Sequence, residues 1–202
     1  NVKILEQQVA EVRAKMVGNY SELFESSVDS ARSVLKADRC SLWLIDKAKG
    51  ELWSKIAHGT KPLRMPLDTG FVGACAKSGA PLVVPLAYED ERFNSSFDKS
   101  SGYVTKSVLC CPIFDNDKAI IGVLQAINKL GKDGKEVSTG FDVRDKVAGN
   151  LFCKSIAAAI VNCEKKAGKD EELTETEAKA EEARLFESSM EISRFSVNAE
   201  AL

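Results

Sequence analysis

The sequence predicts an α+β fold in which an antiparallel sheet carries helices at its flanks. Apolar residues first recur at helical spacing, then follow strand-like patterns in several short segments, and return to helical spacing toward the C-terminal end. The longer strand segments come in pairs joined by short turns, which connect antiparallel neighbours. Helices that are segregated from the strands in this way are typical of an α+β domain.

The N-terminal segment predicts two helical stretches. Its first apolar residues step alternately by three and four positions, as in a coiled-coil seam: Val2, Leu5, Val9, Val12 and Met16. A dimerising arm is therefore expected over 1–18. After Gly18-Asn19 a second stripe predicts a helix that packs on the domain and ends near Ala37-Asp38: Tyr20, Phe24, Val28, Ala31 and Leu35.

A hairpin and a short helix are predicted next. Cys40–Ile45 and Glu51–Ala57 read as strands that flank a turn containing Gly50. A short extended piece around Leu63–Met65 follows. The segment 71–77 predicts a helix capped by Asp68 or Thr69 and closed by Gly79.

The middle of the chain predicts an edge strand, a lid and a central hairpin. Pro81–Pro85 is bounded by prolines, which favours a short edge strand. The polar segment 88–102 predicts a functional loop with one or two helical turns. The apolar runs Ser107–Phe114 and Ala119–Asn128 predict the central hairpin of the sheet.

The last part of the chain predicts one covering helix and one exposed helix. The covering helix follows a Gly-rich loop over 131–140 and has a stripe at helical spacing: Val143, Val147, Leu151, Ile156, Ala159, Ile160 and Cys163. Residues 164–202 are largely polar and predict a long connecting helix. The expected organisation is an arm over 1–18, a domain over 19–163 and a connector over 164–202.

Composition excludes several function classes. No apolar run approaches the roughly 20 residues of a membrane helix, and no signal-peptide core is present, so no membrane association is expected. A net charge of −2 leaves no basic field for a nucleic acid polymer. Six scattered cysteines without a CxxC pair predict reduced, mostly buried thiols and a cytoplasmic protein. The chain lacks an initiator Met and is expected to be part of a longer protein.

One motif resembles a known family. Asn128-Lys129, eleven residues, Phe141, three residues and Asp145 resemble the N-K-x(n)-F-x3-D-E signature of cyclic-nucleotide-binding GAF domains. Lys146 stands where that signature has Glu, which puts the complete network of the motif in doubt.

Other segments resemble the regulatory GAF domains of cyclic nucleotide phosphodiesterases and cover roughly residues 20 to 163 in order. They are Arg39-Cys40-Ser41-Leu42, Gly70-Phe71-Val72-Gly73, Ala87-Tyr88-Glu89-Asp90, Arg92-Phe93-Asn94, Gly102-Tyr103 and Leu109-Cys110-Cys111-Pro112-Ile113. The resemblance implies a six-stranded antiparallel sheet with helices on both faces. It also implies a non-catalytic domain that binds a cyclic nucleotide and controls a linked effector. The effector is expected to be a phosphodiesterase, although some adenylyl cyclases carry the same pattern.

The expected ligand site combines helix physics with this resemblance. The amides of Phe71 and Val72 start a short helix, where free donors and the helix dipole favour a phosphate. Gly70 and Gly73 are equally compatible with a tight turn that has no ligand role. The resemblance adds side chains that line the pocket or approach the base: Ser41, Ala57, His58, Asn94, Asp98, Ser101, Thr105 and Gln125.

The base preference and the motif residues follow from the same comparison. Ala57 and His58 cannot stack on and accept from guanine as an aromatic and an acid would, so cAMP is favoured over cGMP. Lys129 and Asp145 are expected to form an ion pair that fixes the last helix against the sheet.

Two alternatives to a sensor remain open. The first is a ligand-free GAF dimerisation module, since the apolar stripes of the flanking helices favour a homodimer. The second is a GAF-fold thiol enzyme that reduces methionine sulfoxide with Cys75, Cys110 or Cys111 as nucleophile. Cys110 and Cys111 are adjacent in a strand and face opposite ways, which favours core packing. A single His and unclustered Cys residues predict no metal site.

Overall fold

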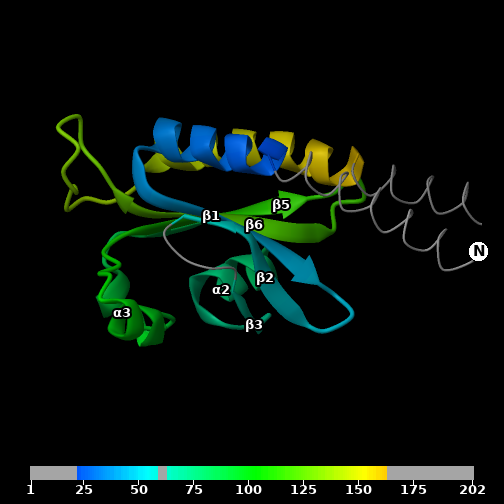
Figure 1. The fold of residues 1–202 in the computed structure, drawn as a ribbon, viewed down its shortest axis with the longest axis horizontal. Helices are drawn as coiled ribbons and strands as arrows, with labels where there is room; N and C mark the ends of the chain where they lie inside the picture. Colours follow the sequence, from blue (N-terminus) through cyan, green and yellow to red (C-terminus); the bar gives the residue numbers. More distant parts are fainter. Residues whose placement is uncertain (1–21, 59–62, 163–202) are drawn as a thin grey trace, which may run out of the picture. The chain divides into compact units, whose positions relative to one another are not determined.

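The computed structural model describes residues 22–58 and 63–162. Within them the chain forms one antiparallel sheet with helical layers on its two faces (Figure 1). The arm over 1–18 and the connector over 164–202 lie outside the described residues, and so do most of the long terminal helices predicted for the chain.

The sheet has six strands in the order β3-β2-β1-β6-β5-β4, and every neighbouring pair is antiparallel. The strands are β1 Ala37–Asp46, β2 Glu51–Ala57, β3 Arg64–Pro66, β4 Leu82–Val84, β5 Val108–Phe114 and β6 Ile120–Lys129. The predicted α+β fold and six-stranded antiparallel sheet are confirmed. The short β4, which prolines bound on both sides, lies at one edge of the sheet. There the lack of a proline N–H costs no hydrogen bond between strands.

Two helices cover one face of the sheet (Figure 1). Residues 22–35 and 143–162 are helical, run antiparallel to each other and lie side by side across the strands. Their buried side chains recur at helical spacing and include Val28, Leu35, Ile156 and Ile160. This layer is the one that the apolar stripes before Cys40 and after Gly140 predict.

The opposite face carries α2 (Gly70–Ser78), the single 3₁₀ turn η1 (Ala87–Glu89) and α3 (Ser96–Ser101). Gly79 ends α2 in the left-handed conformation with φ 65°, as the sequence predicts. Thr69 occupies the N-cap position, but its hydroxyl makes no capping hydrogen bond. The expected side-chain cap from Asp68 or Thr69 is therefore wrong.

The first described helix ends earlier than predicted. It stops at residue 35, Lys36 adopts a left-handed turn with φ 49°, and β1 already begins at Ala37. Ala37 pairs with Lys129 at the end of β6, so the last residues predicted for the helix belong instead to strand β1. Among residues 22–58 and 63–162, no helix combines the length and the apolar character that crossing a bilayer requires.

Candidate ligand-binding site

Three of the expected ligand residues lie in one row across the sheet. Ser41 on β1 pairs with Ala57 on β2 and with Gln125 on β6. Side chains alternate along a strand, so Ser41 and Gln125 share the face of Trp43 and Val123, which pack under α2. The Trp43 indole Nε1 donates to Gln125 Oε1 at 3.1 Å and so orients that side chain.

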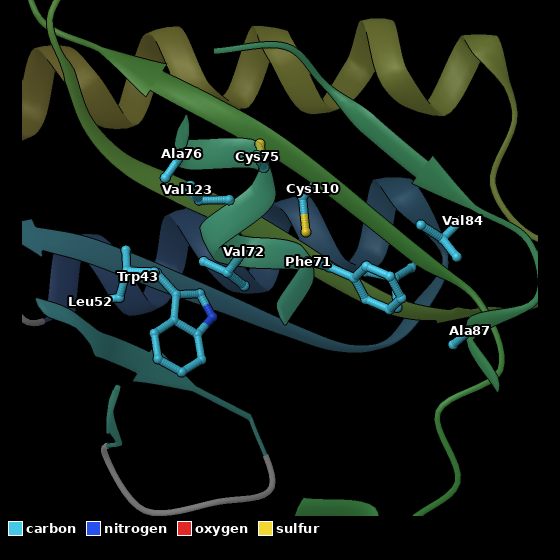
Figure 2. Close-up of a cluster of buried hydrophobic side chains, with 11 residues drawn as sticks. Trp43, Leu52, Phe71, Val72, Cys75, Ala76, Val84, Ala87, Cys110 and Val123 are labelled. Carbon is cyan, nitrogen blue, oxygen red and sulfur yellow. The ribbon is translucent and has the colours of Figure 1, made fainter. Parts of the chain in front are cut away.

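The N-terminus of α2 lies on this same face. The Phe71 and Val72 side chains are buried in the apolar cluster between α2 and the sheet (Figure 2). Gly73 N donates to Thr69 O, but no acceptor within residues 22–58 and 63–162 is found for the backbone amides of Phe71 and Val72. Unbonded amides at a helix start attract an anion.

A guanidinium and a cluster of aromatic rings lie beside the Phe71 side chain. The Arg92 guanidinium is bonded to both carboxylate oxygens of Asp90, at 2.8 and 2.5 Å, and lies 5.8 Å from the Phe71 ring centroid. This bonding holds the pKa of Asp90 below its ordinary value. The Phe93 ring stacks on Phe71 at 5.7 Å, and Tyr88 meets Phe93 at 4.8 Å. Aromatic contacts thus connect α2 to the lid-like segment.

Asp98 and Thr105 form a buried hydrogen-bonded unit within the lid-like segment, which comprises residues 88–105. Asp98 Oδ2 accepts the Thr105 amide at 2.6 Å, and Oδ1 accepts the Thr105 hydroxyl at 2.9 Å. The Tyr88 hydroxyl donates to Oδ2 at 3.1 Å. Partial desolvation, followed by this bond to Asp98, raises the pKa of Tyr88. The two predicted pocket residues therefore satisfy each other's hydrogen-bonding groups and fix the conformation of the segment.

Three expected ligand residues lie elsewhere. The imidazole Nε2 of His58 lies 3.1 Å from Asp29 Oδ1 on the helix 22–35, so His58 belongs to the opposite face of the sheet. Asn94 is exposed and precedes α3, where its Oδ1 accepts the Ser96 amide at 3.0 Å. Ser101 is exposed, and its hydroxyl donates to Phe97 O at 2.8 Å. The structure brings none of these three to the row of Ser41.

The motif residues join the end of β6 to its surroundings. Lys129 Nζ lies 2.5 Å from Asp145 Oδ1 and donates to Leu35 O at 2.8 Å, so one ammonium contacts both covering helices. The expected ion pair is present. The buried Phe141 ring lies 5.7 Å from the same ammonium.

Asn128 links β6 to the end of the lid-like segment. It adopts a left-handed conformation with φ 57° and is 1% exposed. Its Oδ1 accepts the Lys106 amide at 2.7 Å, and its Nδ2 donates to Val104 O at 2.8 Å. The chain after Thr105 is therefore anchored to the sheet.

Arg39 is a cation on the ligand-facing side that the sequence motifs do not mark as a site residue. Arg39 lies two residues before Ser41 on β1, and its guanidinium carbon is 3.6 Å from the ring centroid of Tyr103. The Tyr103 hydroxyl donates to Asp38 Oδ2 at 2.6 Å, and burial raises the pKa of Tyr103. Strand alternation from Ser41 was the signal that could have placed Arg39 on this face.

Comparison with known proteins identifies the family. The GAF domain family matches residues 19–160, which is most of the chain. The chain belongs to the GAF domain family. That match covers the whole described sheet and both of its helical layers.

Curated relatives of this GAF domain include two phosphodiesterases. It is 35% identical over 113 residues to probable 3',5'-cyclic phosphodiesterase pde-5 of Caenorhabditis elegans, covering 49% of this chain and 15% of that protein. It is 42% identical over 109 residues to dual 3',5'-cyclic-AMP and -GMP phosphodiesterase 11A of Takifugu rubripes, covering 48% and 12%. The chain thus spans a small part of the length of these relatives.

Solved structures agree on the fold. The GAF domain of a phosphoenolpyruvate-protein phosphotransferase from Coxiella burnetii has a TM-score of 0.64 at 21% identity, covering 83% of this chain and 96% of that one. The free methionine-R-sulfoxide reductase of Neisseria meningitidis has a TM-score of 0.58 at 18% identity, covering 75% and 81%. At such identities the similarity is one of architecture.

The described cysteines of this GAF domain are poorly placed for thiol catalysis. Burial raises the pKa of Cys40 and of Cys75 to about 12 and that of Cys110 well above its ordinary value. Cys110 points toward α2 (Figure 2), whereas the Cys111 sulfur lies on the other face against Gly149. Hydrogen bonding with Cys153 lowers the pKa of Cys111, but Cys111 is only 1% exposed.

Two of the surface hollows in the described part of the domain lie away from the predicted site. One has a volume of about 340 Å³ and lies beside η1, Lys106 and the loop around Val137; the other, of about 320 Å³, lies between the end of the helix 22–35 and Gly131. Neither is lined by any of the ten predicted ligand residues. No group of three or more potential metal-ligating side chains is found within 22–58 and 63–162.

Proposed function

We propose that this GAF domain is a regulatory sensor that binds a cyclic nucleotide on the α2 side of its sheet. The observation that carries the proposal is the row of Ser41, Ala57 and Gln125 across three strands, on the face that also bears the unbonded amides of Phe71 and Val72. A purine with a cyclic phosphate needs polar partners for its base and an anion site, which Ser41, Gln125 and the start of α2 offer beside the apolar cluster of this face.

The phosphate lies at the start of α2 in this proposal. The Phe71 and Val72 amides donate to it, while the charge of the nearby Arg92 is balanced by Asp90. Phe93 now stacks over Phe71, so binding moves the segment 88–105 away from α2 and then closes it over the ligand. Asn128 fixes the C-terminal end of that segment, which therefore pivots before Val104.

The base lies over the sheet in this proposal. Gln125 offers an amide with both a donor and an acceptor, and no hydrogen bond of the Ser41 hydroxyl is found within the described residues. No acid stands at 57 or 58 to pair with guanine, which favours cAMP over cGMP. His58 and the exposed Asn94 and Ser101 make no direct contact with the base in this arrangement.

The wider setting follows from the relatives. Both curated relatives are phosphodiesterases that this chain matches over a short part of their length, which supports a covalently linked phosphodiesterase as the effector. Nucleotide binding controls that effector allosterically through the flanking helices, which also form a homodimer in the cytoplasm. No membrane and no nucleic acid polymer takes part.

Isothermal titration calorimetry of the chain with cAMP, cGMP and adenosine tests the proposal. Binding of cAMP at about micromolar concentration, weaker binding of cGMP and loss of binding with adenosine, which lacks the phosphate, are expected. Preference for cGMP would overturn the base assignment. Silence with both cyclic nucleotides would overturn the sensor function and leave the ligand-free dimerisation module.

Two variants locate the site. Ser41→Ala and Gln125→Glu are expected to weaken cAMP binding by about tenfold or more, since the first removes a hydroxyl and the second replaces the amide donor with a carboxylate that only accepts. Ser138→Ala, in the hollow beside η1, is the matched control and leaves the affinity unchanged. Asp98 and Thr105 are less suitable for locating the site by substitution. Their replacement breaks the bonds within the segment 88–105 whether or not they contact the ligand.

A further inference from the structure

Trp43 determines how the side-chain amide of Gln125 is turned. Gln125 lies on β6 between Ser41 of β1 and Cys110 of β5, and Trp43 lies two residues after Ser41 on the same face of the sheet. The indole Nε1 of Trp43 donates to Gln125 Oε1 at 3.1 Å. Because an indole N–H is a donor only, the amide oxygen has to face Trp43, and the amide NH₂ has to face away from it.

The surroundings of Trp43 favour this orientation strongly. Trp43 is 6% exposed and belongs to the apolar cluster under α2, with Leu52, Val72 and Val123 (Figure 2). Turning the Gln125 amide by half a turn would bring its NH₂ against the indole N–H and leave a buried donor without its acceptor. Such a donor disfavours the state that contains it by roughly tenfold or more. The amide is therefore oriented before any ligand arrives.

The oriented amide keeps bonding capacity for a ligand. Gln125 is only partly buried, and no hydrogen bond of its Nε2 is found within residues 22–58 and 63–162. Its Oε1 has a second lone pair beside the one that accepts from Trp43. A ligand thus meets an acceptor near Trp43 and a donor farther from it. This order cannot be reversed without breaking the indole bond.

Adenine and guanine differ in the order of their own donors and acceptors. At position 6 adenine carries an amino donor, where guanine carries a carbonyl acceptor. The adjacent ring nitrogen N1 accepts in adenine and carries a hydrogen in guanine. An amide that rotates freely adapts to either base by exchanging the places of its oxygen and its nitrogen. An amide that Trp43 holds matches only one of the two bases in a given pose.

We infer that Trp43 is a specificity-determining residue, whose indole N–H fixes the Gln125 amide and so makes the site discriminate between adenine and guanine nucleotides. The inference rests on the proposed binding of a cyclic nucleotide on the α2 side of the sheet and deepens it. Trp43 is a positioning residue, since it acts on the base through Gln125. With cAMP as the ligand, Gln125 Nε2 donates to a ring nitrogen of adenine, and Oε1 accepts from the amino group.

Calorimetric titration of Trp43→Phe with cAMP and cGMP tests the inference. Phenylalanine fills much of the same apolar space but has no N–H, so the Gln125 amide becomes free to turn. The ratio of the two dissociation constants is therefore expected to move toward one by about tenfold. Trp53→Phe is the matched control, since Trp53 is the only other tryptophan and its ring lies near Arg64 and Lys55. The control should leave the ratio unchanged.

A second background separates action through Gln125 from simple packing. When Gln125→Met has already removed the amide, adding Trp43→Phe should change the ratio no further. Circular dichroism melting checks that the variants fold. Should Trp43→Phe not fold, Trp53→Phe labelled with ¹⁵N leaves one indole N–H resonance, which is expected to shift when Gln125→Met is added. A resonance that stays in place would overturn the inference.

The outcomes distinguish this inference from the proposed function. Equal affinities of the unmodified chain for both nucleotides, or an unchanged ratio in Trp43→Phe, overturn the inference and leave the sensor function in place. A further change of the ratio in the Gln125→Met background also overturns it, because Trp43 would then act through packing. Binding of neither nucleotide to the unmodified chain overturns the sensor function and the inference together.

Discussion

Replacing Asp98 with alanine should destabilise the domain strongly, whether or not a ligand is bound. Asp98 is 5% exposed and accepts three hydrogen bonds, two of them from Thr105, which is itself 6% exposed. In Asp98→Ala the Thr105 amide and hydroxyl lose their acceptor in a place that water hardly reaches. The Tyr88 hydroxyl is nearer to solvent and can bond water instead.

The loss of stability can be worked out from the two Thr105 donors that are left without an acceptor. Each unsatisfied buried donor costs about 1–3 kcal/mol, and relief of the buried carboxylate charge offsets a part, which gives about 3 kcal/mol. In a domain of this size that corresponds to a fall in Tm of about 6–12 °C.

Urea unfolding followed by circular dichroism measures the effect. Thr105→Val should show a smaller loss, because it removes only the hydroxyl bond and leaves the amide bond of residue 105 to Asp98 in place. The double variant should cost little more than Asp98→Ala alone, since Asp98→Ala already removes the hydroxyl bond. Ser101→Ala removes an exposed local bond and should stay within about 0.5 kcal/mol of the unmodified chain. If Asp98→Ala were also within that range, the assignment of Asp98 to the closure of the segment would be refuted.

Three further predictions concern the rest of the domain. Lys129→Met should lower the free energy of unfolding by about 3 kcal/mol, because it leaves the Asp145 carboxylate without its cation in a half-buried place; an unaltered urea midpoint would contradict this. Gly122→Ala should fail to fold stably, since its Cβ would lie 2.4 Å from Trp43 O, whereas Gly134→Ala, with open space but φ 76°, should cost only about 1 kcal/mol by thermal melting. Cys40 and Cys75 should resist alkylation by iodoacetamide at pH 8, because a pKa of about 12 instead of 9 lowers the thiolate fraction about 1000-fold. Peptide mass spectrometry should find both cysteines unlabelled until urea unfolds the chain. Rapid labelling of the native protein would show that they are not buried as described.

Much of the fold could be predicted because local patterns and tertiary structure agree. The stripes through Val28 and Ile156 do face the sheet, and Gly79 ends α2 because a left-handed residue is required there. The boundary near Ala37 could not be predicted, since it depends on pairing with Lys129, ninety-two residues away in the sequence. Local periodicity carries no information about such a partner.

The candidate site was only partly predictable for the same reason. Strand alternation could place Ser41, but a β-bulge opposite Leu42 and Trp43 decides which face each residue of β2 presents. Ala57 stays beside Ser41, while His58 turns toward Asp29. Asp98 and Thr105 were each predicted to line the ligand pocket, but their mutual bonding depends on the path of the chain between them, which no spacing rule defines.

The bonding of Lys129 has a mechanical consequence. Its ammonium is attached at once to the last carbonyl of the helix 22–35 and to a carboxylate in the first turn of the helix 143–162. Gln125 lies four residues earlier on the same strand, about 13 Å away. A displacement of the sheet at Gln125 would thus be transmitted along β6 and through Lys129 to both helices. The two helices would tilt together, because sliding of one past the other would break the bonds of Lys129 to Leu35 and Asp145.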